Sequence, residues 1–203
     1  MKIAWMARLA REVELRILRK SIVHEENGIK IVDPANHSPW FRTILQRSLE
    51  ILHECDAVRY RRVMSELDWV VNMPLSFKGA RYRKSLKACM IDFSEPDEEY
   101  GMSDVNHDAL SIYYACSLVH EATHGKIDRI CRRNESEEER FRSEKICRSE
   151  EARFLSLAKT AYPEAQIHEI PEVDQDAYRQ IYRLSNWDHC RRQFRRLISG
   201  RHE

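Results

Sequence analysis

The chain has 203 residues, 42% of them hydrophobic, and a formal net charge of +1. This length and composition predict a single domain over residues 1–203, and the near-neutral charge argues against a protein that mainly binds nucleic acid. Only 5 glycines and 6 prolines accompany 33% charged residues, which favours a fold dominated by helices.

The cysteines and the hydropathy pattern bear on the cellular compartment. Six cysteines are scattered along the chain, and none belongs to a Cys-x-x-Cys pair. In a domain of this size we expect them to be reduced, mostly buried thiols of a cytoplasmic protein. We also expect no secretory signal and no transmembrane segment, because no apolar run is long enough to cross a bilayer.

The first segment reads as an amphipathic helix over residues 2–20. Apolar residues recur there at helical spacing, and six basic residues occupy other positions. A basic amphipathic helix either packs against its own domain or lies on a membrane surface. Packing against the domain is the commoner outcome, and it is the one we expect here.

A long helix and several short extended runs follow. Apolar spacing from Pro39 predicts a helix over residues 39–66 with a bend near Cys55 and Asp56. Residues 21–34 are irregular to extended. Runs rich in β-branched or aromatic residues, bounded by turn formers, predict strands, the last of them at a sheet edge. These strands span residues 29–32, 69–73, 86–93 and 100–102.

The most informative stretch is a His-Glu-x-x-His motif at residues 120–124. In a helix, His120 and His124 lie one turn apart on the same face, so their ring nitrogens can hold one zinc ion from one side. Glu121 then lies beside the metal, where its carboxylate can take a proton from a bound water. The motif therefore predicts a zinc site with Glu121 as a catalytic residue.

The residues before the motif predict that its helix is buried. Residues 111–122 carry apolar side chains on nearly all sides of the predicted helix, which is typical of a central, buried helix. Asn106 or Asp108 can cap its start. Gly125 directly follows the second histidine and suits a chain that leaves the helix with a positive φ.

The His-Glu-x-x-His signature resembles that of the zincin metallopeptidases, whose active-site helix carries these residues. The resemblance implies an α+β, helix-dominated fold in which a small β-sheet covers the active-site helix and its edge strand pairs with an extended peptide or protein substrate. It also implies a zinc metallopeptidase that hydrolyses peptide bonds with a zinc-activated water and Glu121 as general base. Helical extensions over about 1–66 and 172–203 would flank this zincin-like domain.

A catalytic zinc site needs a third protein ligand, and the next helix offers two candidates. The capping box at residues 136–139 starts a helix that can run to Lys159. Glu144 and Glu151 lie within its broad apolar sector, where a carboxylate needs a metal or a cationic partner. Glu144 is the preferred ligand, whereas Glu151 either orients a histidine or is itself the ligand. The alternative is that both carboxylates pair with arginines such as Arg148.

The spacing of Glu144 is similar to that of the gluzincins, the zincin branch with a glutamate ligand. Glu144 follows His124 by twenty positions. In that branch an acidic residue four places after the ligand steadies a histidine, and here that position is Arg148, which departs from the pattern. A histidine is the ligand in another zincin branch, which leaves His168 and His189 as alternatives, and His107 is a weaker candidate.

The C-terminal region offers candidates for a further catalytic role. In gluzincins a tyrosine or histidine downstream of the third ligand stabilises the developing oxyanion, and Tyr178, Tyr182 and His189 are available for that role. An arginine-rich helix over 187–201 is either a solvated face or a site for an acidic partner.

Two functions compete with the peptidase. One is a helical interaction or regulatory protein with a structural or degenerate zinc site, and the other is a zinc hydrolase that acts on a non-peptide amide.

Overall fold

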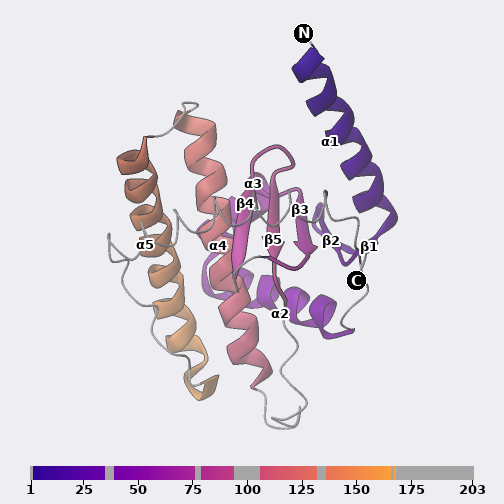
Figure 1. The fold of residues 1–203 in the computed structure, drawn as a ribbon. Helices are drawn as coiled ribbons and strands as arrows, with labels where there is room; N and C mark the ends of the chain where they lie inside the picture. Colours follow the sequence, from indigo (N-terminus) through magenta and orange to yellow (C-terminus); the bar gives the residue numbers. More distant parts are fainter. Residues whose placement is uncertain are drawn as a thin grey trace.

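The computed structural model describes residues 2–34, 39–75, 79–93, 106–131, 136–165 and 167. They form a mixed α+β structure in which long helices surround a five-stranded sheet (Figure 1). The helices are α1 (Lys2–Lys20), α2 (Pro39–Cys55), α3 (Ala57–Glu66), α4 (His107–Cys131) and α5 (Glu137–Ala161), followed by a short 3-10 turn (Pro163–Ala165). The strands are β1 (Ile22–Glu26), β2 (Ile29–Val32), β3 (Trp69–Asn72), β4 (Ala80–Arg83) and β5 (Ala88–Ile91).

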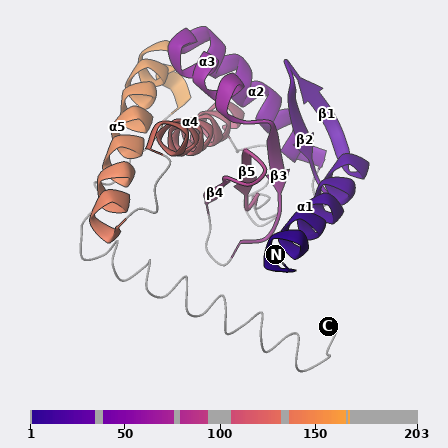
Figure 2. The same cartoon turned by 90° about the horizontal axis from the view of Figure 1, so that it is seen from above.

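The sheet has the strand order β1-β2-β3-β5-β4. The three central strands run parallel, and the edge strands β1 and β4 are antiparallel to their neighbours. β4 forms the edge that lies beside α4 (Figure 2). The strands predicted at 29–32, 69–73 and 86–93 are confirmed, the last two with shorter bounds, whereas β1 and β4 were not predicted as separate strands.

Alternating side chains on the strands bury both faces of the sheet. One face packs against α2, α3 and α4 and includes Ile31, Val70 and Cys89. The opposite face packs against α1 through Leu15 and Leu18. The helix predicted at 2–20 is confirmed as α1, and its C-terminal end lies against the sheet of its own domain (Figures 1 and 2), whereas its apolar residues Val13 and Ile17 are exposed.

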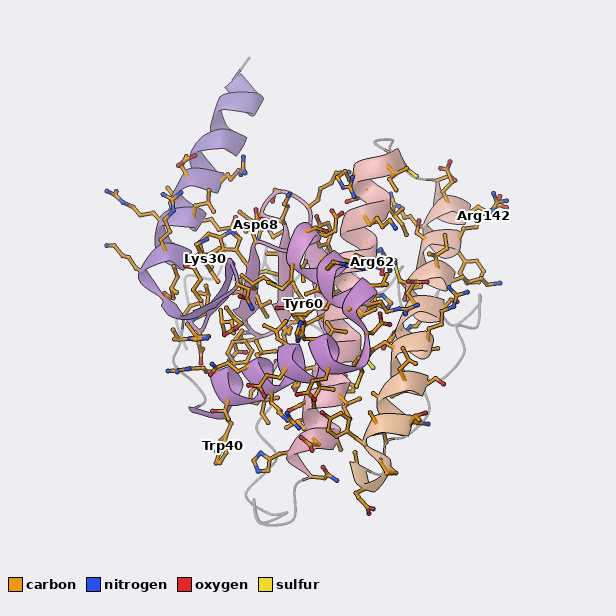
Figure 3. The ribbon with its side chains drawn as sticks, turned by 180° about the vertical axis from the view of Figure 1, so that it is seen from behind. Lys30, Trp40, Tyr60, Arg62, Asp68 and Arg142 are labelled. Atoms are coloured by element: carbon orange, nitrogen blue, oxygen red, sulfur yellow. The ribbon has the colours of Figure 1, made fainter. Side chains whose placement is uncertain are left out.

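The central helix α4 has the burial that its sequence predicts, with twelve buried residues between Ser111 and Gly125. Asn106 caps its start, since its side-chain Oδ1 accepts a hydrogen bond from the N–H of Ala109 at 3.0 Å. Asp108 instead pairs with Arg47 of α2. α2 and α3 cover one side of α4, and α5 lies along another (Figure 3).

The expectation that the chain leaves this helix at Gly125 is wrong. α4 continues to Cys131, and Gly125 is an ordinary helical residue without a positive φ. The glycine is needed for space, because a Cβ atom there would lie 3.1 Å from Glu66 Cβ and 3.1 Å from Tyr82 Oη. The missing side chain lets α3 and β4 approach α4 closely.

Side-chain caps explain where the other helices begin. The bend predicted near Cys55 is a break between α2 and α3, where the buried Asp56 carboxylate accepts hydrogen bonds from the N–H groups of Val58 and Arg59. The predicted capping box at 136–139 is confirmed as the start of α5, with reciprocal bonds between Ser136 and Glu139.

Several predictions lie outside the described residues. They are the edge strand at 100–102, the C-terminal extension and the arginine-rich helix at 187–201. The five cysteines within the described part are free thiols, and Cys89, Cys116 and Cys147 are buried. None of the helices that the structure describes is long and apolar enough to cross a lipid bilayer.

Candidate metal centre

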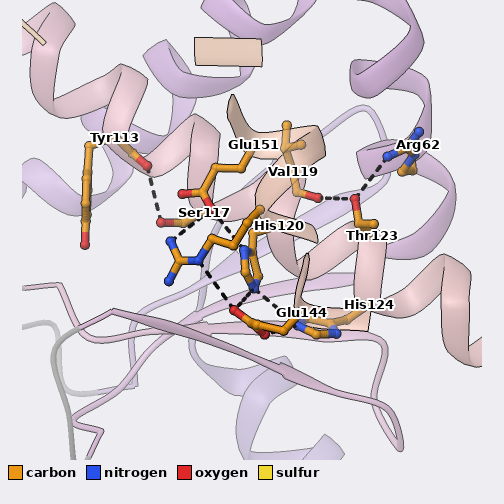
Figure 4. Close-up of polar contacts among 10 residues, drawn as sticks. Arg62, Tyr113, Ser117, Val119, His120, Thr123, His124, Glu144 and Glu151 are labelled. Carbon is orange, nitrogen blue, oxygen red and sulfur yellow. Dashed lines mark hydrogen bonds and ion pairs between the residues drawn. The ribbon is translucent and has the colours of Figure 1, made fainter. Parts of the chain in front are cut away.

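The two motif histidines meet on the face of α4 that looks toward α5. Their Nε2 atoms lie 3.2 Å apart, and the ring centroids are separated by 5.0 Å (Figure 4). His120 is buried, whereas His124 remains partly exposed. Two ring nitrogens therefore point at one small region that is reached from the surface on the His124 side.

α5 adds the carboxylate of Glu144 to the same region. Its Oε1 lies 3.3 Å from His120 Nε2, and its Oε2 lies 3.4 Å from His124 Nε2. Ligand atoms around a tetrahedral zinc ion, at bond lengths near 2.0–2.1 Å, are separated by about 3.3 Å. We call the two nitrogens and the Glu144 carboxylate the ligand triangle; its two edges to the carboxylate end on different oxygen atoms, and all three edges are close to this separation.

Glu151 contacts His120 from the other side of the ring. Its Oε2 lies 3.0 Å from His120 Nδ1, and the carboxylate is buried. An Nδ1–H donated to this carboxylate leaves the lone pair of Nε2 free for a metal. Glu151 is therefore placed to orient His120, which is one of the two roles expected for it.

Arg148 lies between the two carboxylates of α5. Its Nη1 is 3.1 Å from Glu151 Oε2, and its Nε is 3.5 Å from Glu144 Oε1. Both carboxylates therefore contact an arginine, as the alternative prediction proposed, and they contact the histidines as well. Arg148, which departs from the gluzincin pattern, reduces the negative charge around the site. Glu151, about one turn further along α5, contacts His120.

Glu121 is buried on the side of α4 that faces β4. Burial raises the pKa of its carboxyl group, and His120 and His124 oppose that shift. The backbone N–H of Tyr82 on β4 donates a hydrogen bond to this carboxylate and lowers its pKa slightly. A carboxyl group with a raised pKa next to a metal-binding face can accept a proton and release it again.

Cys147 also belongs to this cluster, and sequence reasoning missed it. Its sulfur and one ring nitrogen each of His120 and His124 all lie within 4.8 Å of one another. Burial, reinforced by the nearby carboxylates, holds the pKa of this thiol well above its usual value. Its position three residues after Glu144 is the signal in the sequence that both side chains face the same way on a helix.

Of the other predicted site residues, only His107 lies in the described part of the chain, and it is not part of this cluster. His107 is the first residue of α4, where its ring contacts Trp40. Tyr178, Tyr182, His168 and His189 lie outside the described residues. Among the residues that the structure describes, the cluster consists of side chains from α4 and α5 and the backbone of Tyr82 on β4.

Without a metal, the histidines and carboxylates stabilise one another. Burial alone would lower the pKa of His120, but its contacts with Glu144 and Glu151 outweigh burial and raise it to about 10. Burial would raise the pKa of Glu144, and the two histidines hold it well below its usual range. A metal must displace the proton of His120, so zinc binding competes with protonation here.

These shifts predict how the stability of the metal-free protein depends on pH. The pKa of His120 is higher in the folded state than its usual 6.5, so its contribution is complete below pH 6.5 and disappears as the pH rises to about 10. Urea unfolding in the presence of a chelator should show stability falling over this range, and His120→Gln should flatten the curve. A metal-free wild type whose stability does not fall between these pH values would contradict the assigned contacts.

The residues present fit a divalent cation that accepts nitrogen and oxygen ligands. Two neutral imidazoles and one carboxylate form the usual protein part of a catalytic zinc site. The thiol of Cys147 would suit zinc as well, since zinc also binds sulfur.

Comparisons of the chain with protein-family models, with curated proteins and with solved structures find no match. Any functional conclusion therefore depends on the geometry and chemistry of the cluster itself.

Proposed function

We propose that this protein is a zinc-dependent metallopeptidase. The observation that carries the proposal is the ligand triangle: His120 Nε2 and His124 Nε2 lie 3.2 Å apart, and the two oxygens of the Glu144 carboxylate lie 3.3 and 3.4 Å from them, which are separations close to those around a zinc ion. When bound, zinc supplies a Lewis acid that polarises a carbonyl group and lowers the pKa of a water molecule. His120, His124 and Glu144 would hold the ion, and Glu151 would orient His120.

Glu121 is the general base in this proposal. It follows His120 directly on α4 and is buried, so its carboxylate is shielded from bulk solvent. The Glu121 carboxylate takes a proton from the attacking water and then delivers it to the leaving amine nitrogen. The hydrogen bond from the backbone of Tyr82 holds the carboxylate in place.

The edge strand β4 supports a peptide as the substrate. Gly79 C=O accepts a hydrogen bond from Asp92 N–H, so residues 79, 81 and 83 face β5 in the antiparallel register. The backbone groups of Ala80 and Tyr82 therefore point away from β5, and because the Tyr82 N–H donates to Glu121, the Ala80 N–H and the two carbonyl groups are those at the edge beside α4. An extended peptide can add to such an edge, next to Glu121.

The direct test is cleavage of a mixed peptide library by the zinc-loaded protein. We expect new peptide termini that appear only with zinc and disappear with a chelator. Complete absence of cleavage by protein that holds one zinc ion would overturn the peptidase proposal.

A second function is favoured by Cys147. If its sulfur bound the metal together with His120, His124 and Glu144, four protein ligands would close the site, as in structural zinc sites. The protein would then be a helical interaction protein with a structural zinc ion.

Replacing zinc with Co²⁺ distinguishes the two ligand sets, because zinc itself has no visible spectrum. We expect the Co²⁺ protein to lack thiolate-to-metal charge transfer in the near ultraviolet, and Cys147→Ser to have the same spectrum as the wild type. The carboxylate is favoured because its oxygens already lie at ligand distance from both nitrogens. A charge-transfer band that Cys147→Ser removes would identify the closed, structural site.

A further inference from the structure

The side chain of Arg62 on α3 connects the two helices of the metal centre. Its Nη1 donates a hydrogen bond to Thr123 Oγ1 on α4 at 3.0 Å (Figure 4) and lies 2.6 Å from Glu150 Oε2 on α5. The side chains of Arg62 and Glu150 are each only 13% exposed, so this ion pair is largely removed from water.

Each contact of Arg62 falls next to a residue of the metal centre. Thr123 directly precedes His124, and its hydroxyl donates to the carbonyl oxygen of Val119, which directly precedes His120. Glu150 directly precedes Glu151, the partner of His120. The Arg62 guanidinium therefore contacts both α4 and α5 at positions next to the metal cluster.

The surrounding charges make this connection rigid. Arg59 also pairs with Glu150, at 3.3 Å, and with the capping residue Asp56. Because the Glu150 side chain is only 13% exposed, loss of Arg62 removes a close counter-ion from a charge that is largely shielded from water. The helices α4 and α5 cannot slide past each other without breaking these directional contacts.

We propose that Arg62 is a positioning residue that sets the spacing of the metal ligands on α4 and α5. The inference rests on the proposed zinc site. Two ligand atoms come from α4 and one from α5, so a shift between the helices changes two of the three edges of the ligand triangle. Residues outside the ligand set that fix such geometry typically contribute 10–100-fold to metal affinity.

The chain offers a matched control in Arg129. Its guanidinium pairs with the buried Glu66 at 2.6 Å and connects α4 to α3. None of the contacts described for Arg129 reaches α5. Arg62→Met removes an ion pair between α3 and α5 and a hydrogen bond between α3 and α4, whereas Arg129→Met removes an ion pair between α4 and α3. Only the first removes a contact to α5, where Arg59 still pairs with Glu150 in both variants.

The experiment measures zinc affinity by competition with a chromophoric chelator, together with the melting temperature of each metal-free variant. We expect Arg62→Met to weaken zinc binding on the order of tenfold, Arg62→Lys to restore most of it, and Arg129→Met to leave it unchanged. Glu150→Gln, which keeps the side-chain volume, should weaken binding in the same direction as Arg62→Met. Equal loss of affinity in Arg62→Met and Arg129→Met would overturn the proposal, because general destabilisation would then explain both.

A different outcome would separate this inference from the proposed function. If the wild type bound no zinc, the peptidase proposal would fail. The effect of Arg62 on the position of His120 would then be measured from the His120 ring signals in NMR spectra of the metal-free proteins. Arg62→Met should shift those signals and Arg129→Met should not. Unchanged His120 signals in Arg62→Met would then overturn the positioning role.

Discussion

Glu121→Gln should bind zinc as tightly as the wild type and lose peptide cleavage by at least about 100-fold, since a general base contributes roughly 10²–10⁴-fold. The amide has the size of the carboxylate and can still accept the hydrogen bond from the backbone of Tyr82. It cannot take a proton from water. Retained metal with lost turnover is therefore the expected signature of a base that acts beside the ion.

The measurement compares zinc content and initial cleavage rates on the same peptide mixture. Glu138→Gln is the matched control, because Glu138 lies on α5 but is exposed and pairs only with Arg142 among the contacts described. We expect that control to behave like the wild type in both assays. Equal cleavage by Glu121→Gln would remove Glu121 from the mechanism.

Glu144→Ala should lose zinc far more readily than any other single carboxylate replacement on α5. Loss of a group that only orients a ligand costs about 10–100-fold in affinity, and loss of a ligand should exceed about 100-fold. The reason is geometric: Glu144 provides two of the three edges of the ligand triangle, to His120 and to His124.

Dialysis against a chelator followed by metal analysis measures this retention. Glu138→Ala is again the suitable control. Glu150 is not, although it lies on the same helix, because it holds the ion pair with Arg62. If Glu144→Ala retained zinc as well as Glu138→Ala does, the third ligand would have to be sought elsewhere, first at Cys147.

The sequence predicted the convergence of the two helices because their periodic patterns are strong. Residues 111–122 are apolar on nearly all sides, so α4 had to be central, and the capping box fixed the phase of α5. Advancing by about 100° per residue then placed Glu144 and Glu151 on the buried face. The structure brings both carboxylates to His120, in agreement with that reasoning.

Features that depend on distant parts of the chain were not accessible in this way. The contact between Arg62 and Thr123 joins residues 61 positions apart, and no local pattern distinguishes Arg62 from the other arginines of α3. β4 is only four residues long and carries two exposed arginines, so it lacks the apolar signal of a strand. Gly125 was misread because a glycine after a motif is more often a helix end than a point of close packing.

That glycine has a consequence for the engineering and divergence of this protein. α4 has no spare room on the side of Gly125, so even an alanine there would require Glu66 or Tyr82 to give way by a few tenths of an ångström. Tyr82 is the same residue whose backbone steadies the Glu121 carboxylate. A single uncharged methyl group added one residue beyond the motif would therefore displace Tyr82 on β4, and this displacement would reach the carboxylate of the proposed base.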